Sequence, residues 1–257
     1  MKWLHHRNPE GPKYFVYVSD TKVDMLFNQI PRDLRDRIAV ELDISPINLG
    51  IKLAEKTPAE KNRFSKARLV ARYCEENLGV GTIDAPQSYF KGRMPLKWGR
   101  YGSTSAKERG GRPLTHTFVK EETVLFTGST SHTVLAMGGS RRHLISSIGH
   151  SYTDSFSDTE SISELMIREE LPPRSDPYLD YDKIEAGILY AAFLAVQKQR
   201  GPEQRVEFLA KKLLFGPPSR LYYFDRNSKS RLIPEGTNVL LSSPIYVAYA
   251  DDRTEAS

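Results

Sequence analysis

The sequence predicts a single α+β domain over residues 1–257, in which a mixed sheet is flanked by helices. Three observations favour this class. Runs rich in aromatic and β-branched residues occur near both ends of the chain, and strand-like and helix-like segments do not alternate regularly. A third is composition, since 39% hydrophobic and 27% charged residues over 257 positions are ordinary for a folded domain. Two lobes, 13–150 and 151–250, are the alternative division.

The N-terminal part predicts a β-α-α-β-α unit. Tyr14 to Val18 is an aromatic and β-branched run that is typical of a buried strand. Apolar residues at helical spacing follow, and Pro31 is placed to begin a second helix. Gly79 is a helix stop signal. The elements are expected at 14–18 (strand), 23–30 and 31–42 (helices), 44–53 (strand) and 57–78 (helix).

The central part predicts short strands that glycine and proline separate. Gly128–Ser131 is typical of a hairpin turn between two of them. Residues 103–112 are small, polar and rich in glycine, which predicts a mobile loop. The strands are expected at 89–94, 115–120, 124–127 and 133–136.

The last hundred residues predict three helices followed by two strands. The long middle helix has one apolar face that runs from Ile184 to Val196. Pro244 lies inside the final strand, which indicates an edge strand or a bulge. The helices are expected at 161–170, 180–200 and 203–215, and the strands at 221–225 and 239–249.

Composition excludes several classes of protein. No run of eighteen apolar residues exists, so no membrane partner is expected, and the first residues lack the apolar core of a secretory signal. Cys74 is the single cysteine, which precludes an internal disulfide and a cysteine-built metal site. There is no GxSxG or HExxH motif. A cytoplasmic protein without a cofactor is the expectation.

The most charged segment is Tyr89–Arg112, which carries seven Lys and Arg residues against one acid. Its net charge of +6 exceeds the +5 of the whole chain. Cations beside aromatic rings suit a phosphate-bearing ligand, because the cations attract phosphate and the rings stack on bases. The alternatives are a sheet edge that Lys and Arg keep soluble, or pairing with acidic helices of the same chain. The ligand-binding candidates are Lys91, Arg93, Lys97, Trp98, Arg100 and Tyr101.

A second candidate begins where a predicted strand meets two glycines, a serine and a basic turn. Converging backbone N–H groups and a helix N-terminus would favour an anion there. The alternative is an ordinary tight turn with Ser140 as the helix N-cap. The candidates in this segment are Gly138, Gly139, Ser140, Arg141, Arg142 and His143.

Asp20 and Asp24 lie four residues apart, so on a helix they would share a face. Two carboxylates on one face could hold Mg²⁺ through water molecules. Capping explains the same residues, with Asp20 or Thr21 as the N-cap and Asp24 in a capping box, and it is the preferred interpretation. No metal site is therefore assigned, and Asp20 and Asp24 stay weak candidates.

Three segments, YFVYVSDTKVDMLFNQIP, LAMGGSRRHLI and YDKIEAGILYAAFLAV, resemble an uncharacterised family of actinobacterial, Streptomyces-type proteins. The resemblance extends over nearly the whole chain. It implies a bacterial cytoplasmic protein, and it implies no activity and no site residues.

The sequence therefore favours a non-enzymatic binding or sensing module for an anionic ligand, either a nucleotide, a nucleic acid or a phosphorylated metabolite. One alternative is a metal-dependent phosphoesterase with Asp20 and Asp24 as ligands and His143 as acid/base. Another is a protein–protein adaptor that shares the Ile184–Val196 face with a partner.

Overall fold

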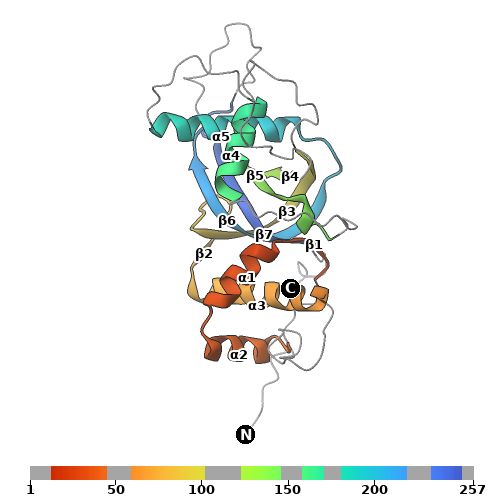
Figure 1. Cartoon of the computed structure of the whole chain (residues 1–257). Coiled ribbons are helices and arrows are strands. Elements are labelled where there is room, and N and C mark those ends of the chain that lie inside the picture. Colours follow the sequence, from red (N-terminus) through yellow and green to blue (C-terminus); the bar gives the residue numbers. More distant parts are fainter. Residues whose placement is uncertain are drawn as a thin grey trace, which may run out of the picture.

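The computed structural model describes residues 13–44, 59–101, 123–145, 158–170, 181–218 and 233–250 (Figure 1). The strands predicted at 44–53, 115–120 and 221–225, and the loop predicted at 103–112, lie outside these ranges except for Ile44. The described residues form an α+β fold, as predicted, with a barrel between two helical layers.

The lower helical layer follows the predicted order, apart from the strand at 44–53, which lies outside the described residues. It contains β1 (Phe15–Val18), α1 (Asp20–Gln29), α2 (Arg32–Glu41) and α3 (Ala59–Asn77). Gly79 follows α3 with a φ of +63°, a left-handed conformation that glycine adopts without strain and that ends helices. The apolar sides of these helices pack together and against the ends of two barrel strands, which places the layer beneath the barrel in Figure 1.

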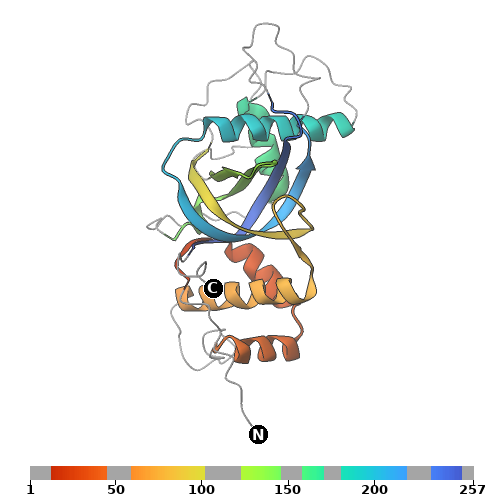
Figure 2. The same ribbon diagram turned by 180° about the vertical axis from the view of Figure 1, so that it is seen from behind.

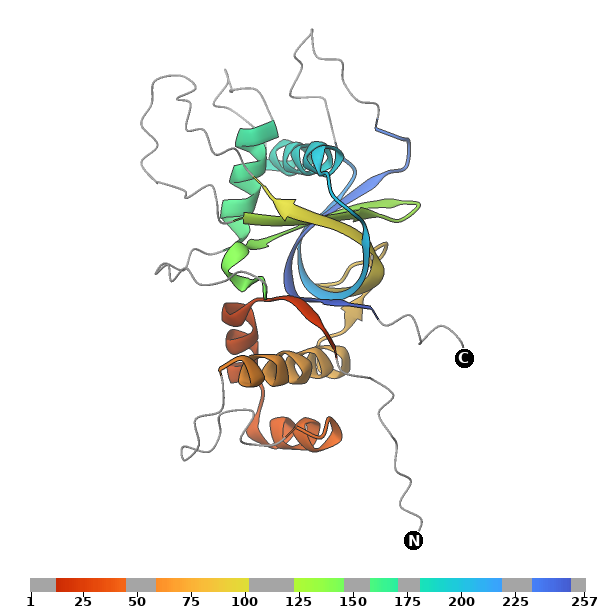
Figure 3. The same cartoon turned by 90° about the vertical axis from the view of Figure 1, so that its right-hand side faces the viewer.

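Five strands close the barrel. They are β3 (Tyr89–Arg100), β4 (Thr123–Ser129), β5 (Thr133–Ser140), β6 (Gln204–Gly216) and β7 (Asn238–Tyr249). β3 pairs with β4, β4 with β5, β5 with β7, β7 with β6, and β6 again with β3. The β5–β7 pair is parallel and the other four are antiparallel. Figure 3 shows the strands curving into a ring.

Two short strands extend this barrel at its margins. β1 pairs with the second half of β7, while β5 pairs with the first half, so β1 continues the row of β5. β2 (Val80–Gly81) runs parallel to the start of β3. Strands from before and after residue 150 therefore share one sheet.

The barrel has the connectivity of the OB-fold. Counted along the chain from β3, its strands follow the order 1-2-3-5-4-1, and the third and fifth strands are parallel. The helices α4 (Asp158–Glu170) and α5 (Tyr181–Lys198) stand between the third and fourth strands. This five-stranded Greek-key barrel is a scaffold that many binding proteins use.

The helix predicted at 203–215 is wrong, because these residues form β6. Val206, Phe208 and Ala210 alternate into the barrel interior, and β6 pairs with β3 on one side and β7 on the other. The Glu, Leu, Ala and Lys content of this segment is helical by propensity. Pairing on both sides overrides that preference.

Pro244 marks a bulge, as predicted, but it does not lie in an edge strand. The pairing of β6 with β7 shifts between Leu209 and Ala210, which leaves Ile245 as an extra residue next to Pro244. The bulge is therefore confirmed. β7 is no edge strand, since it has neighbours on both sides.

The upper helical layer covers one face of the barrel. Ile162 and Met166 of α4 and Phe193 of α5 pack on Leu125 of β4 and Ala136 of β5. The apolar face predicted for the long helix is confirmed over residues 188–196, and it faces the barrel. Figure 1 shows α4 in front of the barrel, and Figure 2 shows it behind.

The β4–β5 hairpin is close to its predicted position, and its strands are three and four residues longer than predicted. The Thr130 N–H donates to the Thr133 carbonyl over 2.9 Å, and the Thr130 hydroxyl donates to Asp84 over 2.6 Å.

In the part of the chain that the structure describes, no helix is long and apolar enough to cross a membrane.

Candidate anion-binding surface

The basic residues of β3 lie on the outside of the barrel. Because side chains alternate along a strand, Phe90, Met94 and Leu96 point into the barrel core, and the odd-numbered residues point outward. Lys91, Arg93 and Lys97 therefore share the outer face of β3.

Arg205 of the neighbouring strand β6 stands at the one position in this series where β3 has no cation. Pro95 stands between Arg93 and Lys97, and it pairs with Arg205 of β6. Directly paired residues project from the same side of a sheet, so Arg205 stands beside Pro95 on the outer face. Both are exposed. We call Lys91, Arg93, Arg205 and Lys97 the cation row; alternate residues along a strand are about 7 Å apart.

Three glutamates lie along the cation row. Lys91 Nζ is 3.0 Å from Glu75 Oε1, and Lys97 Nζ is 3.3 Å from Glu203 Oε1. Glu207 pairs with Arg93 across the strands, and its Oε1 lies 2.9 Å from Lys13 Nζ. The four cations of the row outnumber these three acids, and Lys13 adds a fifth cation. The pairing with acids of the same chain, which the sequence left as an alternative, is thus present for Lys91 and Lys97.

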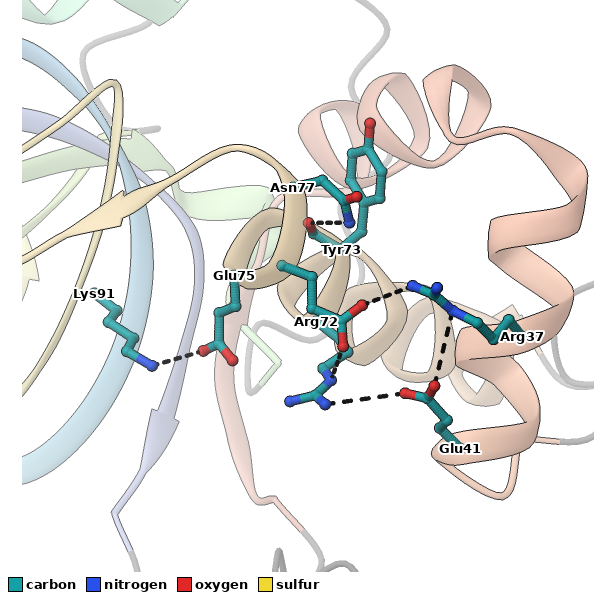
Figure 4. Close-up of polar contacts among 8 residues, drawn as sticks. Arg37, Glu41, Arg72, Tyr73, Glu75, Asn77 and Lys91 are labelled. Carbon is teal, nitrogen blue, oxygen red and sulfur yellow. Dashed lines mark hydrogen bonds and ion pairs between the residues drawn. The ribbon is translucent and has the colours of Figure 1, made fainter.

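The acid beside Lys91 belongs to a helix that is held by a ring of ion pairs (Figure 4). Arg37 and Glu41 of α2 each contact a residue of α3, with Arg37 Nη2 at 3.0 Å from Glu76 Oε2 and Arg72 Nη2 at 3.9 Å from Glu41 Oε2. Arg72 Nε also lies 2.7 Å from Glu76 Oε1. This ring joins α2 to α3, and the Lys91–Glu75 pair joins α3 to the barrel.

Trp98 lies near one end of the barrel, half-buried. Its ring centroid is 5.9 Å from that of Phe126 and 6.3 Å from that of Tyr249. Tyr249 remains 45% exposed. Trp98 thus packs against the barrel core, and Tyr249 is the exposed ring beside it.

Tyr101 is not available for stacking, because it is 7% exposed and packs in the core. Its hydroxyl donates to Glu170 Oε1 over 3.1 Å, and Lys198 Nζ lies 2.5 Å from Glu170 Oε2. These contacts join β3, α4 and α5. Tyr101 therefore has a structural position.

The glycine turn predicted at Gly138–Gly139 is wrong, because β5 continues through Ser140 and both glycines pair with β4. A Cβ on Gly138 would lie 2.4 Å from Ile162 Cγ1, and one on Gly139 would lie 2.4 Å from the Tyr17 hydroxyl oxygen. The two glycines let these neighbours approach. The helix expected after Ser140 is a single 3-10 turn, η2 (Arg141–His143).

His143, Asp20 and Arg63 meet where β1, η2 and α3 come together. Arg63 Nε is 2.7 Å from Asp20 Oδ1, and His143 Nδ1 is 3.5 Å from Asp20 Oδ2. Arg63 also donates to the carbonyls of Val18 and, over 3.1 Å, of His143. The group ties three segments together at a partly buried position.

The two weak metal candidates face different cations. Asp20 contacts Arg63, and Asp24 Oδ1 lies 2.7 Å from Lys66 Nζ. Among the residues that the structure describes, no group of three His, Cys, Asp or Glu side chains is arranged to hold a metal ion.

The two basic segments approach each other at one end of the barrel. Arg100 pairs with Val124, and Val124 pairs with Gly139. Two strand spacings separate Arg100 from Gly139, which is about 10 Å. Arg142, three residues beyond Gly139, is exposed, as is Arg100. Residues 107–112 of the basic segment lie outside the described residues.

Cys74 is buried in α3, and burial raises the pKa of its thiol to about 12. The nearby Glu75 carboxylate adds to this rise. Because the thiolate is the nucleophile, a thiol with so high a pKa is unreactive at neutral pH. The predicted inert cysteine agrees with this environment.

Sequence reasoning missed Arg205 and Tyr249. Arg205 was placed on a predicted helix, where it could not align with β3, and the alternation of Val206, Phe208 and Ala210 was the signal that would have corrected this. No local signal connects Tyr249 to Trp98, because 151 residues of chain separate them.

These observations define the class of the molecule as an OB-type barrel with one covered face and one basic face. The chain belongs to the Family of unknown function (DUF7019), whose model matches residues 13–251. The predicted membership of an uncharacterised family is thereby confirmed, and the actinobacterial origin stays a prediction. No curated protein and no solved structure matches the chain.

Proposed function

We propose that this protein is a non-enzymatic binding module for nucleic acid in a bacterial cytoplasm, and that the cation row contacts the phosphate backbone. The observation that supports the proposal is the row itself. Lys91, Arg93 and Lys97 project from one side of β3, and Arg205 fills the remaining position. A line of cations about 7 Å apart suits a polymer whose charges also repeat along a line.

One face of the barrel is covered by helices, which leaves the opposite face for the ligand. Oligonucleotides commonly bind OB-folds across the second and third strands, which are β4 and β5 in this protein. Here α4 and α5 pack on these two strands, with Gly138 against Ile162. The β3–β6 pair, on the side that faces the viewer in Figure 2, keeps Pro95 and Arg205 exposed. The ligand therefore binds on the β3–β6 face.

The ion pairs of the row do not prevent binding. Glu203 is 59% exposed and Lys97 is 39% exposed, so their pair contributes no more than about 1 kcal/mol. A phosphate brings a full charge to the same cation and releases bound counterions. Exchange of Glu203 for a phosphate is thus favourable at low salt and weakens as salt is added.

Fluorescence anisotropy of a labelled oligonucleotide, titrated with protein at several salt concentrations, tests the proposal. Four phosphate contacts predict a slope of log K against log salt of about −3 for a single strand. Arg205→Ala should weaken binding and reduce the slope by about one. The matched control is Arg32→Ala, which removes an 82% exposed arginine from α2 and should leave both quantities unchanged.

Two results would contradict the proposal. One is the absence of binding by the wild-type protein at low salt. The other is equal loss of affinity in Arg205→Ala and Arg32→Ala, since this would mean that overall charge, and not the cation row, attracts the oligonucleotide.

The two other functions that the sequence left open have less support. Asp20 and Asp24, the ligands of a metal-dependent phosphoesterase, face Arg63 and Lys66. The helical face of a protein–protein adaptor packs on the barrel of the same chain, with Leu189 and Phe193 buried.

A further inference from the structure

We infer that Trp98 and Tyr249 form a stacking site for an unpaired base, so that the ligand is a single strand. This inference rests on the proposed function and adds the class of nucleic acid to it. It is carried by the position of the two rings, the exposure of Tyr249 and the strand positions that the rings occupy at the end of the cation row.

The two rings come from opposite ends of the barrel sequence and meet at one end of the barrel. Trp98 pairs with Phe126 of β4, and Tyr249 pairs with Val206 of β6. The Trp98 and Tyr249 planes are inclined by 55° with centroids 6.3 Å apart. Phe126 is fully buried behind Trp98, whereas Tyr249 is 45% exposed. The indole is held in place from the interior, and the phenol presents a ring to solvent.

The cation row ends beside these rings. Lys97 directly precedes Trp98, and Arg205 directly precedes Val206, the strand partner of Tyr249. A chain of phosphates that follows the row therefore reaches the barrel end at Lys97 and Arg205. Their side chains project from the outer face, whereas the two rings lie on the inner side of the sheet, because their strand partners are interior residues. A base therefore reaches the exposed ring of Tyr249 where the nucleic-acid strand passes over the end of the barrel.

Stacking of this kind discriminates between single and double strands. In a duplex the faces of the bases are covered by their neighbours, so a protein ring cannot stack on them without opening the helix. In a single strand each base has an accessible face. Removal of one stacking aromatic ring commonly lowers the affinity for a single strand about 5- to 150-fold.

Tryptophan fluorescence measures this contact directly. The chain has two tryptophans, Trp3 and Trp98, so Trp3→Phe leaves Trp98 as the only source of tryptophan emission. The probes are a single-stranded thymidine oligonucleotide of about ten residues, a duplex of similar length, and inorganic polyphosphate. We expect the single strand to quench Trp98, and we expect polyphosphate to bind without quenching because it has no bases.

Two substitutions at one position separate stacking from packing. Tyr249→Phe retains the ring and should bind the single strand as the wild type does. Tyr249→Leu retains apolar bulk without a ring, and should lose about 5- to 150-fold in affinity for the single strand and nothing for polyphosphate. Thermal unfolding of both variants checks that each is folded.

The outcomes distinguish the two proposals. Equal affinity for single strand and duplex, or equal affinity of Tyr249→Leu and Tyr249→Phe, overturns the stacking site. Arg205→Ala would still weaken binding in that case, and the proposed function would stand. If none of the three probes binds the wild-type protein, both proposals fail.

Discussion

The two faces of the barrel share one interior and differ outside. On the β4–β5 face the outward residues are small or apolar, as at Leu125, Ala136 and Gly138, and α4 and α5 pack on them. On the β3–β6 face, the outward residues from Arg93 to Lys97 and their β6 partners are Lys, Arg and Glu apart from Pro95, and no described helix packs on them. Outward side chains, which barrel closure does not require, therefore decide whether a face binds a helix or remains available for a ligand.

The largest expected effect compares one truncation on each face. Leu125→Ala removes a fully buried side chain beneath the helices and should lower the free energy of unfolding by about 2–5 kcal/mol. Arg205→Ala, on the open face, should change it by less than about 0.5 kcal/mol. Urea denaturation of the two variants measures both values. Similar losses would mean that the β3–β6 face is also part of the packed structure.

An intermediate effect concerns the close approach of α4 to β5. Gly138→Ala would place a Cβ 2.4 Å from Ile162 Cγ1, which should cost about 1–3 kcal/mol of stability through overpacking. The same change in an Ile162→Ala background should cost less, because the clashing atoms are absent. A double-mutant cycle by urea denaturation gives the coupling. A cost that is independent of Ile162 would show that α4 does not press on Gly138.

The smallest expected effect is a pH dependence at the hairpin of the covered face. The hydrogen bond from Thr130 lowers the pKa of Asp84 below its ordinary value of 3.8, and His132 adds to the lowering. Because the pKa of Asp84 is lower in the folded than in the unfolded state, the charged carboxylate stabilises the fold at pH values above its unfolded-state pKa. This stability is lost as the pH falls through the lowered pKa. Asp84 is exposed, so we expect less than about 1 kcal/mol.

Urea denaturation at pH 6 and pH 3 checks this prediction. The stability of the wild type should fall slightly more on acidification than that of Asp84→Asn, which has no charge to lose. Identical changes in the two proteins would assign the acid sensitivity to other carboxylates.

Most elements could be predicted because their signals are local. Pro31 before α2 and Gly79 after α3 mark boundaries through backbone preferences that the residues have by themselves. The turn predicted at Gly128–Ser131 lies two residues later, because Gly128 and Ser129 still pair within β4. β6 could not be identified by propensity, since its strand form depends on β3 and β7, which are distant in sequence. Barrel closure is likewise a property of pairings and not of segments.

The candidate site was predictable in its charge and not in its geometry. Lys91, Arg93 and Lys97 alternate along β3, a pattern that the sequence displays. Gly138 and Gly139 were assigned to a turn because glycine pairs often form turns, whereas here they make room for Ile162 and Tyr17. Such a role depends on side chains from other elements, which no local pattern contains.

The position of β7 has a consequence for the order in which the molecule is made. β7 is the last described strand, and it joins β1, β5 and β6. While a ribosome is still adding residues 238–249, β5 and β6 lack the neighbour that closes the ring, and β1 lacks its strand partner. Until β7 is present, the edges of β1, β5 and β6 are exposed, and exposed strand edges are prone to association with other chains. Closure of the barrel is therefore a late event, which requires that residues 238–249 have been synthesised.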